Sequence, residues 1–229
     1  QYMFLHTHPY EPFLYKEATK LIVGTLPPPR FTKGTFKKGD VDFCYGSIDG
    51  QLWPILDRIF GLNLKFERTA AAIAQRKNFL KSKKIGICDI VASAERIKVD
   101  ASDLGMRNVK LRDLIRYLQE FPRIEMLIFT GGNSKNGPEY FFRKLLKQYG
   151  IPLGLVNDKV PRIHEFAMPE IRGASESEPS RIITTVSLTA PSGTANRAVG
   201  SLREYKDLKD KHPEFNTLDF RVLQYRNFF

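Results

Sequence analysis

The side chains best suited to chemistry gather between residues 42 and 56, in the stretch DFCYGSIDGQLWPIL. Its aromatic pair, Phe43 and Tyr45, can stack a planar base, and the carboxylate of Asp49 can orient a water molecule beside them. Trp53, the only tryptophan of the chain, is more typical of a core anchor. Asp49 is also a residue type that caps turns and helices. The stretch therefore predicts either a base-binding site with Asp49 as its acid–base group or a structural turn.

A second carboxylate, Asp89, falls near the end of the apolar run KIGICDIV (84–91), with Ser93 and Arg96 close behind it. Ligands of parallel-sheet proteins bind at the carboxyl ends of strands, so Asp89 can contact a base or a water molecule there. The alternative is a structural carboxylate that pairs with Arg96 or caps a turn. Asp49 and Asp89 are the two candidate catalytic residues.

Three loops follow apolar runs and have compositions that suit a ligand. The first, TLPPPR, comes after Gly24, which permits a close backbone approach, and neither GxGxxG nor GxxxxGK[ST] occurs there to support a nucleotide site. The second, TGGNSKNG (130–137), offers Asn133 and Lys135 for phosphate contacts, although an ordinary strand-to-helix loop has a similar composition. The third, LTAPSGTANRA (188–198), gives up side-chain packing and leaves its backbone open to another molecule.

The charge balance favours a polyanionic partner. The chain has 36 Lys and Arg against 25 Asp and Glu, a net charge of +11 and a pI near 9.6. Such a surface attracts nucleic acid by counterion release, and the alternative is a basic surface that only aids solubility. No apolar run approaches the length of a membrane span, and the N-terminus lacks a secretory signal pattern. We expect an intracellular, cytoplasmic protein, associated with the nucleoid in a bacterium.

Cysteine and histidine positions indicate no metal and no cofactor. Cys44 and Cys88 are too few for a disulfide framework and have no neighbouring ligand at zinc spacing, so we expect both to be reduced and packed. The pair His6 and His8 in HTHP could chelate a metal, but without a third ligand nearby we expect incidental surface residues.

Strand and helix patterns alternate along the chain. Four apolar, β-branched runs predict strands buried on both faces: 20–24, 84–91, 124–131 and 181–187. Amphipathic patterns predict helices at 51–60, 69–82, 110–120, 137–150 and 196–211. The polar stretch 172–180 reads as a surface loop. The expected fold class is α/β, a three-layer sandwich whose central, mainly four-stranded parallel sheet is flanked by helices, in one domain spanning 1–229.

The order of four motifs resembles that of the uracil-DNA glycosylase superfamily. They are LIVGTLPPPR, YGSIDGQLWPIL, GICDIVASAERIKVDASD and LTAPSGTANRA, and they cover about residues 20 to 200. Within the superfamily the chain is most similar to the branch of mismatch-specific and hypoxanthine (deoxyinosine) DNA glycosylases. The resemblance implies a monofunctional, metal-independent enzyme that flips a deaminated base, uracil or hypoxanthine, out of DNA and hydrolyses its N-glycosidic bond.

The resemblance also implies a base pocket and exposes two departures from the family pattern. Its first motif lines the base pocket, and here Gly24, Thr25, Leu26 and Pro27 match it, with Phe43 and Tyr45 as stacking residues. Leu26 stands where many members carry a water-activating Asp or Asn, as a hydrophobic residue also does in the hypoxanthine branch. Gly50 stands where that branch has its catalytic Asn. Either Asp49 or another polar residue orients water, or the protein binds DNA without cleaving it.

For the last motif the resemblance implies entry into the DNA minor groove. Small residues let the backbone approach phosphates, Arg197 supplies charge, and Asn196 can cap the following helix or reach the opposite base. The expected DNA-contacting residues of this loop are Pro191, Ser192, Gly193, Thr194, Asn196 and Arg197. A plain loop with a helix cap is the alternative. We expect a monomer that binds DNA containing damaged or mismatched bases, without a cofactor.

A small-molecule hydrolase with Ser192 or Cys44 as nucleophile is a further alternative. It has little support, because Ser192 is not in a GxSxG setting and no histidine motif is tied to either residue.

Overall fold

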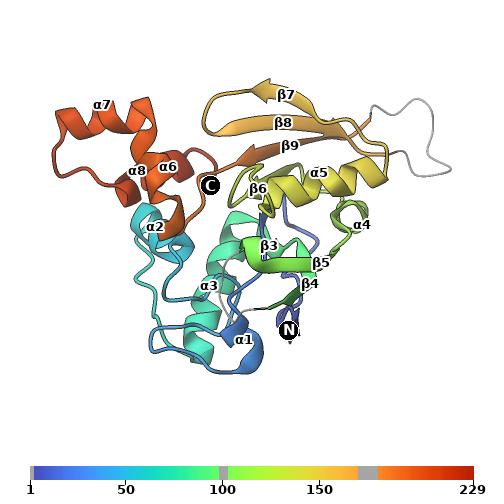
Figure 1. Cartoon of the computed structure of the whole chain (residues 1–229), viewed down its shortest axis with the longest axis horizontal. Coiled ribbons are helices and arrows are strands. Elements are labelled where there is room, and N and C mark those ends of the chain that lie inside the picture. The colour runs from blue at the N-terminus through green and yellow to red at the C-terminus, as the bar shows by residue number, and fades with distance from the viewer. Residues whose placement is uncertain (1–2, 98–102, 170–179) are drawn as a thin grey trace.

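The computed structural model describes residues 3–97, 103–169 and 180–229, which fold around a six-stranded mixed sheet (Figure 1). Its strands are β2 (Lys20–Gly24), β3 (Ile85–Asp89), β6 (Met126–Phe129), β7 (Gly154–Asn157), β8 (Arg162–Ala167) and β9 (Ile182–Ser187), in the order β3-β2-β6-β9-β8-β7. Neighbours from β3 to β9 pair in parallel, whereas β8 and β7 extend the sheet antiparallel. The α/β class is confirmed, and the sheet is wider than the sequence patterns predict.

Helices cover both faces of this sheet, because successive side chains of a buried strand point to opposite sides. Leu21 and Val23 of β2 pack in one apolar cluster with α4 (Leu114–Glu120) and α5 (Pro138–Gln148). Ile22, between them, belongs to a second cluster on the other face. The helices of that second cluster are α2 (Leu52–Phe60), α3 (Ala70–Lys83) and α8 (Thr217–Arg226). Trp53 of α2 is 1% exposed and donates to the carbonyl of Cys44, which confirms it as a core anchor.

Three short strands form a second, antiparallel sheet that the patterns did not predict. They are β1 (Phe4–Thr7), β4 (Val91–Arg96) and β5 (Met106–Leu111), in the order β1-β4-β5. The run 84–91, predicted as one strand, contains parts of two strands. β3 of the large sheet ends at Asp89, and β4 of the small sheet begins at Val91. The helix predicted at 110–120 begins only at Leu114.

The remaining helical segments depart from the predictions at their ends. The helix predicted at 196–211 is divided at Leu202, whose ψ of 135° is extended. Its two parts are α6 (Asn196–Ser201) and α7 (Arg203–Lys211), which lie with α8 at one end of the molecule (Figure 1). Three short segments complete the elements: α1 (Pro29–Lys33), η1 (Asp103–Gly105) and η2 (Gly193–Ala195). Residues 172–179 of the predicted surface loop lie outside the described residues.

The expectation that His6 and His8 are incidental surface residues is wrong. Both are buried, at 0% and 8% exposed, and His6 is paired to Ala94 of β4 in the small sheet. The His6 Nδ1 atom accepts a 2.8 Å hydrogen bond from Nε of Arg96. Burial, reinforced by the positive charge of Arg96, lowers the pKa of His6 from 6.5 to about 4. His6 is therefore neutral at pH 7.

The lowered pKa of His6 predicts that protonation of this one residue reduces the free energy of unfolding in acid. Unfolded chains bind a proton at His6 below pH 6.5 and the folded chain only below about 4, so stability present above pH 6.5 is lost as pH falls toward 4. The loss amounts to as much as about 3 kcal/mol. Asn at position 6 keeps an acceptor for Arg96 but cannot titrate. Urea unfolding of His6→Asn should show a shallower pH dependence in this window than the wild type, and equal slopes would contradict the assignment.

Candidate functional site

The carboxyl edge of the parallel strands brings the predicted site residues of two motifs together. Gly24, the last residue of β2, is the register partner of Asp89, the last residue of β3. Thr130 follows the neighbouring strand β6, and its amide donates to the carbonyl of Val23. Tyr45 reaches the same edge, where its hydroxyl lies 3.4 Å from both the Cys88 carbonyl and the Thr130 hydroxyl. Residues distant in sequence thus converge where parallel sheets bind ligands.

Gly24 is required by the crowding at this point. A Cβ atom there would lie 2.2 Å from the Tyr45 hydroxyl and 2.6 Å from Oδ1 of Asp89. The Asp89 carboxylate and the Tyr45 phenol therefore both lie against the strand end, in the space that a side chain at position 24 would occupy. Tyr45 itself has φ of 58°, a left-handed backbone that costs free energy for a non-glycine residue. Such strain is concentrated at functional sites.

The second oxygen of Asp89 is held by a histidine that the sequence analysis did not assign to the site. His8 Nε2 lies 2.6 Å from Asp89 Oδ2, and His8 Nδ1 accepts a 3.0 Å hydrogen bond from the Tyr10 amide. Because Nδ1 is an acceptor, the proton of the neutral ring is on Nε2 and is donated to the carboxylate. Asp89 is 5% exposed, so this is a buried carboxylate with one oxygen engaged and the other directed toward Gly24.

A cation completes the surroundings of Asp89. Arg112, which follows β5, donates to the Tyr10 carbonyl at 2.7 Å and lies 3.5 Å from the Asp89 carbonyl. Burial raises the pKa of Tyr45 well above its usual value, and the nearby negative charge of Asp89 raises it further. The phenol is therefore neutral and remains a hydrogen-bond donor at any physiological pH.

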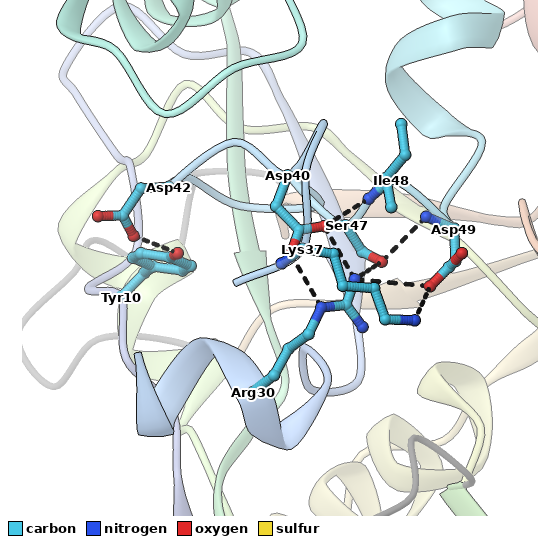
Figure 2. Close-up of polar contacts among 8 residues, drawn as sticks. All are labelled: Tyr10, Arg30, Lys37, Asp40, Asp42, Ser47, Ile48 and Asp49. Carbon is cyan, nitrogen blue, oxygen red and sulfur yellow. Dashed lines mark hydrogen bonds and ion pairs between the residues drawn. The ribbon is translucent and has the colours of Figure 1, made fainter. Parts of the chain in front are cut away.

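Asp49 lies in a different environment, on a loop organised by a buried ion pair (Figure 2). Asp40 accepts two 2.9 Å hydrogen bonds from Arg30 and further ones from the amides of Lys37 and Ile48. These bonds, foremost the one from Arg30, hold the pKa of Asp40 below its usual range despite the opposing effect of burial. Asp49 lies on the rim of this cluster with a side chain 66% exposed.

The ion pairs of Asp49 are those of a surface residue. Its carboxylate lies 3.2 Å from Lys37 Nζ and 3.6 Å from Arg30, and its amide donates to the Ser47 hydroxyl (Figure 2). The structure therefore separates the two candidate carboxylates by environment: Asp89 is buried and bonded to His8, whereas Asp49 is solvated and paired with cations.

The loop around Asp49 runs beside the predicted DNA-binding loop. Gly50 forms an isolated antiparallel bridge with Ser192, and the amide of Gln51 donates to the Pro191 carbonyl at 2.8 Å. Gly50 therefore contributes its backbone to this junction. The two motifs form one continuous edge of the site.

A buried arginine from α8 fixes the predicted DNA-binding loop. Arg221, 0% exposed, donates to the carbonyls of Ala190 and Ser192 at 2.9 and 2.8 Å. Its NH1 group donates to Asn196 Oδ1 at 2.9 Å. Gln224 of the same helix adds hydrogen bonds to Thr189. The loop backbone is thereby held in one conformation from the side opposite the solvent.

Two predicted site residues have other roles. Phe43, expected to stack a base, is 7% exposed and packs against Trp53 and Phe13, because its side chain points into the core beneath the loop. Asn196, expected to cap α6 or reach an opposite base, makes no side-chain cap and instead accepts from Arg221. Both are structural residues of the site.

The other predicted residues lie along the site edge. Asn133 and Lys135 are exposed on the loop after β6, Gly193 and Thr194 are exposed in η2 after β9, and Arg197 is exposed in α6. The hydroxyls of Ser192 and Thr194 are hydrogen-bonded to each other at 2.7 Å. Thr25, Leu26, Pro27 and Pro191 are half-buried at the strand ends. The exposed group offers amides and cations to a ligand approaching this edge.

Nucleophilic and metal chemistry find little support in the described residues. No three His, Cys, Asp or Glu side chains of the described ranges gather at metal-binding distances. Cys44 and Cys88 are free and buried, and burial raises the pKa of both thiols, which keeps them protonated.

No helix within residues 3–97, 103–169 and 180–229 is long and apolar enough to cross a membrane.

Comparisons with protein-family models, curated proteins and solved structures found no match for this chain. The function proposed below is therefore supported by the geometry of the site and by the resemblance of the motifs.

The clamp by Arg221 predicts a local effect of its removal. Arg221→Met leaves the carbonyls of Ala190 and Ser192 without their donor, and should lower the free energy of unfolding by about 2–4 kcal/mol. Amide hydrogen exchange at 189–196 should accelerate before that of the central strands. Arg226→Met, at an exposed position of the same helix, is the control and should change neither. Unchanged exchange at 189–196 in Arg221→Met would show that the loop does not depend on the clamp.

Proposed function

We propose that this protein is a DNA glycosylase that hydrolyses the N-glycosidic bond of a deaminated base, uracil or hypoxanthine, flipped out of DNA. The observation that carries the proposal is the buried Asp89 carboxylate at the carboxyl edge of the sheet. One of its oxygens is bonded to His8, and the other lies with the Tyr45 hydroxyl in the space next to Gly24 that a side chain at position 24 would occupy. Such an arrangement supplies both groups that this hydrolysis needs.

Asp89 is the proposed water-orienting residue. Cleavage proceeds through a sugar with cationic character, and water then adds its oxygen to the anomeric carbon as the base leaves with the bonding electrons. A buried carboxylate offsets the positive charge and accepts a proton from the attacking water. The hydrogen bond from His8 fixes Oδ2, so that Oδ1 is the oxygen available for this role. His8 is therefore a positioning residue for Asp89.

Tyr45 is the proposed base-binding residue. Its hydroxyl makes two 3.4 Å contacts, which are long for hydrogen bonds, so a shift of the ring that admits a base breaks no short hydrogen bond of this hydroxyl. Its face then stacks the flipped base, which offsets part of the cost of flipping. Because the phenol stays neutral, it can donate to a carbonyl oxygen of uracil or hypoxanthine as negative charge develops on the leaving base.

The adjoining loops are the proposed phosphate-binding surface. The backbone around Gly193 is held by Arg221, and two exposed cations lie nearby in the fold: Arg197 in α6 and Lys135 on the loop after β6. A rigid loop of small residues loses little conformational entropy when it approaches a phosphate backbone. The net charge of +11 adds a sequence-independent attraction to DNA. A single-domain monomer that needs no cofactor suffices for this chemistry.

A DNA-binding relative without catalytic activity is the second candidate. The observation in its favour is Gly50, which provides only backbone at the position of the family's catalytic Asn and bridges Ser192. In this candidate the loop held by Arg221 and the exposed cations still bind DNA. It predicts salt-sensitive binding of DNA without release of a base.

Asparagine substitutions at the two carboxylates test which one orients water. Asp89→Asn retains an acceptor for His8 but not the negative charge, and should slow single-turnover base release by at least about 100-fold. Asp49→Asn removes only exposed ion pairs and should change the rate by less than about threefold. Duplexes carrying uracil or hypoxanthine are incubated with each variant, and alkali then reveals abasic sites. Binding to the same duplexes controls for folding.

The reverse result, with Asp49→Asn slow and Asp89→Asn unaffected, would contradict the assignment of Asp89 and favour Asp49 as the water-orienting residue.

A further inference from the structure

A groove of about 740 Å³ lies away from the strand-end site, between β5 and α5. All six residues of β5 line one wall, and side chains of α5 such as Tyr140 and Lys144 line the other. Its volume is in the range of ligand-binding clefts, and its length follows a strand. Lys135 also belongs to the phosphate-binding surface proposed above, and the other lining residues have no part in the proposed base release.

The strand wall of this groove is an open sheet edge. In the order β1-β4-β5, β5 pairs with β4 along one edge, and no other strand of the described residues pairs with it. An edge strand presents a row of backbone donors and acceptors, which an extended chain can complete by pairing. The groove between a strand edge and a helix is therefore shaped for one extended polypeptide.

The groove is also basic. Arg107 and Lys110 project from β5, and Lys135 and Lys144 lie on the opposite side, all of them exposed. The only carboxylate among the lining residues, Asp113, accepts hydrogen bonds from the Tyr149 hydroxyl and the Arg116 amide. Its charge is therefore partly engaged within the protein. The net positive charge of the walls selects for an acidic occupant.

Its aromatic residues are poorly placed for a nucleic acid strand. Binding of single strands depends on free ring faces on which bases stack. Here the Lys144 ammonium lies 4.7 Å from the centre of the Tyr140 ring, so it covers a face that a base would need. The hydroxyl of Tyr149 is bonded to Asp113 and is therefore already engaged within the protein. The walls thus match an acidic peptide better than an oligonucleotide.

We propose that the groove binds an acidic segment of a protein partner, which adds as an extended strand to β5. Backbone pairing with the free edge supplies affinity, and Glu or Asp side chains at alternate positions meet Lys110 and Lys144 on the two walls. A segment of about six residues spans the strand. The partner's chemistry, an acidic β-forming sequence, follows from the charges and the open edge.

Fluorescence anisotropy with a short labelled peptide of alternating Glu and Val tests this proposal on the full chain. We expect saturable binding at low salt. A peptide of the same sequence, N-methylated on alternate amides, keeps the charge but loses strand pairing, and should bind at least about tenfold more weakly. The double variant Lys110→Glu/Lys144→Glu should weaken binding of the unmethylated peptide by at least about tenfold. Lys147→Glu, on the same helix but outside the groove, is the matched control and should change it by less than about threefold.

Three results would overturn the proposal. Absence of binding at low salt excludes the acidic peptide as occupant. Equal binding of the N-methylated peptide would show attraction by charge alone. Binding of a short thymidine oligonucleotide that is lost in Lys110→Glu/Lys144→Glu, with no effect of that variant on the peptide, would assign the groove to nucleic acid.

Discussion

The hydrogen bond between His8 and Asp89 joins the two sheets of the molecule at the site. His8 follows β1 of the small sheet, and Asp89 ends β3 of the large one, with 2.6 Å between their side chains. The His8 amide also donates to the Ala92 carbonyl at 2.9 Å, which holds the N-terminal segment in place. A buried carboxylate without a hydrogen-bond partner is costly, and His8 supplies that partner. This bond fixes Oδ2 of Asp89 and so leaves Oδ1 beside Gly24 and the phenol of Tyr45.

The opposite side of the site depends on the C-terminal helix. Arg221 of α8 binds the loop that follows β9, and this loop in turn pairs with Gly50 and Gln51. A buried guanidinium is costly to desolvate, and burial lowers the pKa of Arg221. The cost is offset by hydrogen bonds to loop carbonyls that would otherwise lack donors. His8, near one end of the chain, thus positions Asp89, and Arg221, near the other end, positions the loop after β9.

The sequence patterns found the centre of the fold and missed its periphery for physical reasons. The predicted strand at 20–24 and helices at 51–60 and 69–82 match β2, α2 and α3 closely, because long apolar stripes determine buried elements. The hairpin of β7 and β8 was missed because four-residue, exposed β7 has almost no such stripe. Helix α8 was missed because it buries polar side chains, although its capping box of Asn216 and Asp219 was a readable signal.

The candidate site was only partly predictable for the same reason. Asp89 and Tyr45 stood out by type and place, but the role of His8 depends on a contact across 81 positions of sequence. His6 lies in β1 and His8 directly follows it, and both are buried while Thr7 between them is exposed. Such alternation is a weak strand signal in an element of only four residues. Phe43 and Tyr45 are two residues apart but have different surroundings. The Phe43 ring packs against Trp53 in the core, whereas the Tyr45 hydroxyl reaches the strand ends, and the backbone at Tyr45 is left-handed. Local sequence alone does not determine this difference.

Base release by the wild-type protein tests the central claim most directly. Single-turnover reactions on duplexes that carry uracil, hypoxanthine or only normal bases, followed by alkali, report abasic sites without reference to any variant. The account predicts release from at least one deaminated base, none from the normal duplex, and an intact strand until alkali is added. Binding of all three duplexes without release of any base would contradict it and would identify a DNA-binding relative that has lost catalysis.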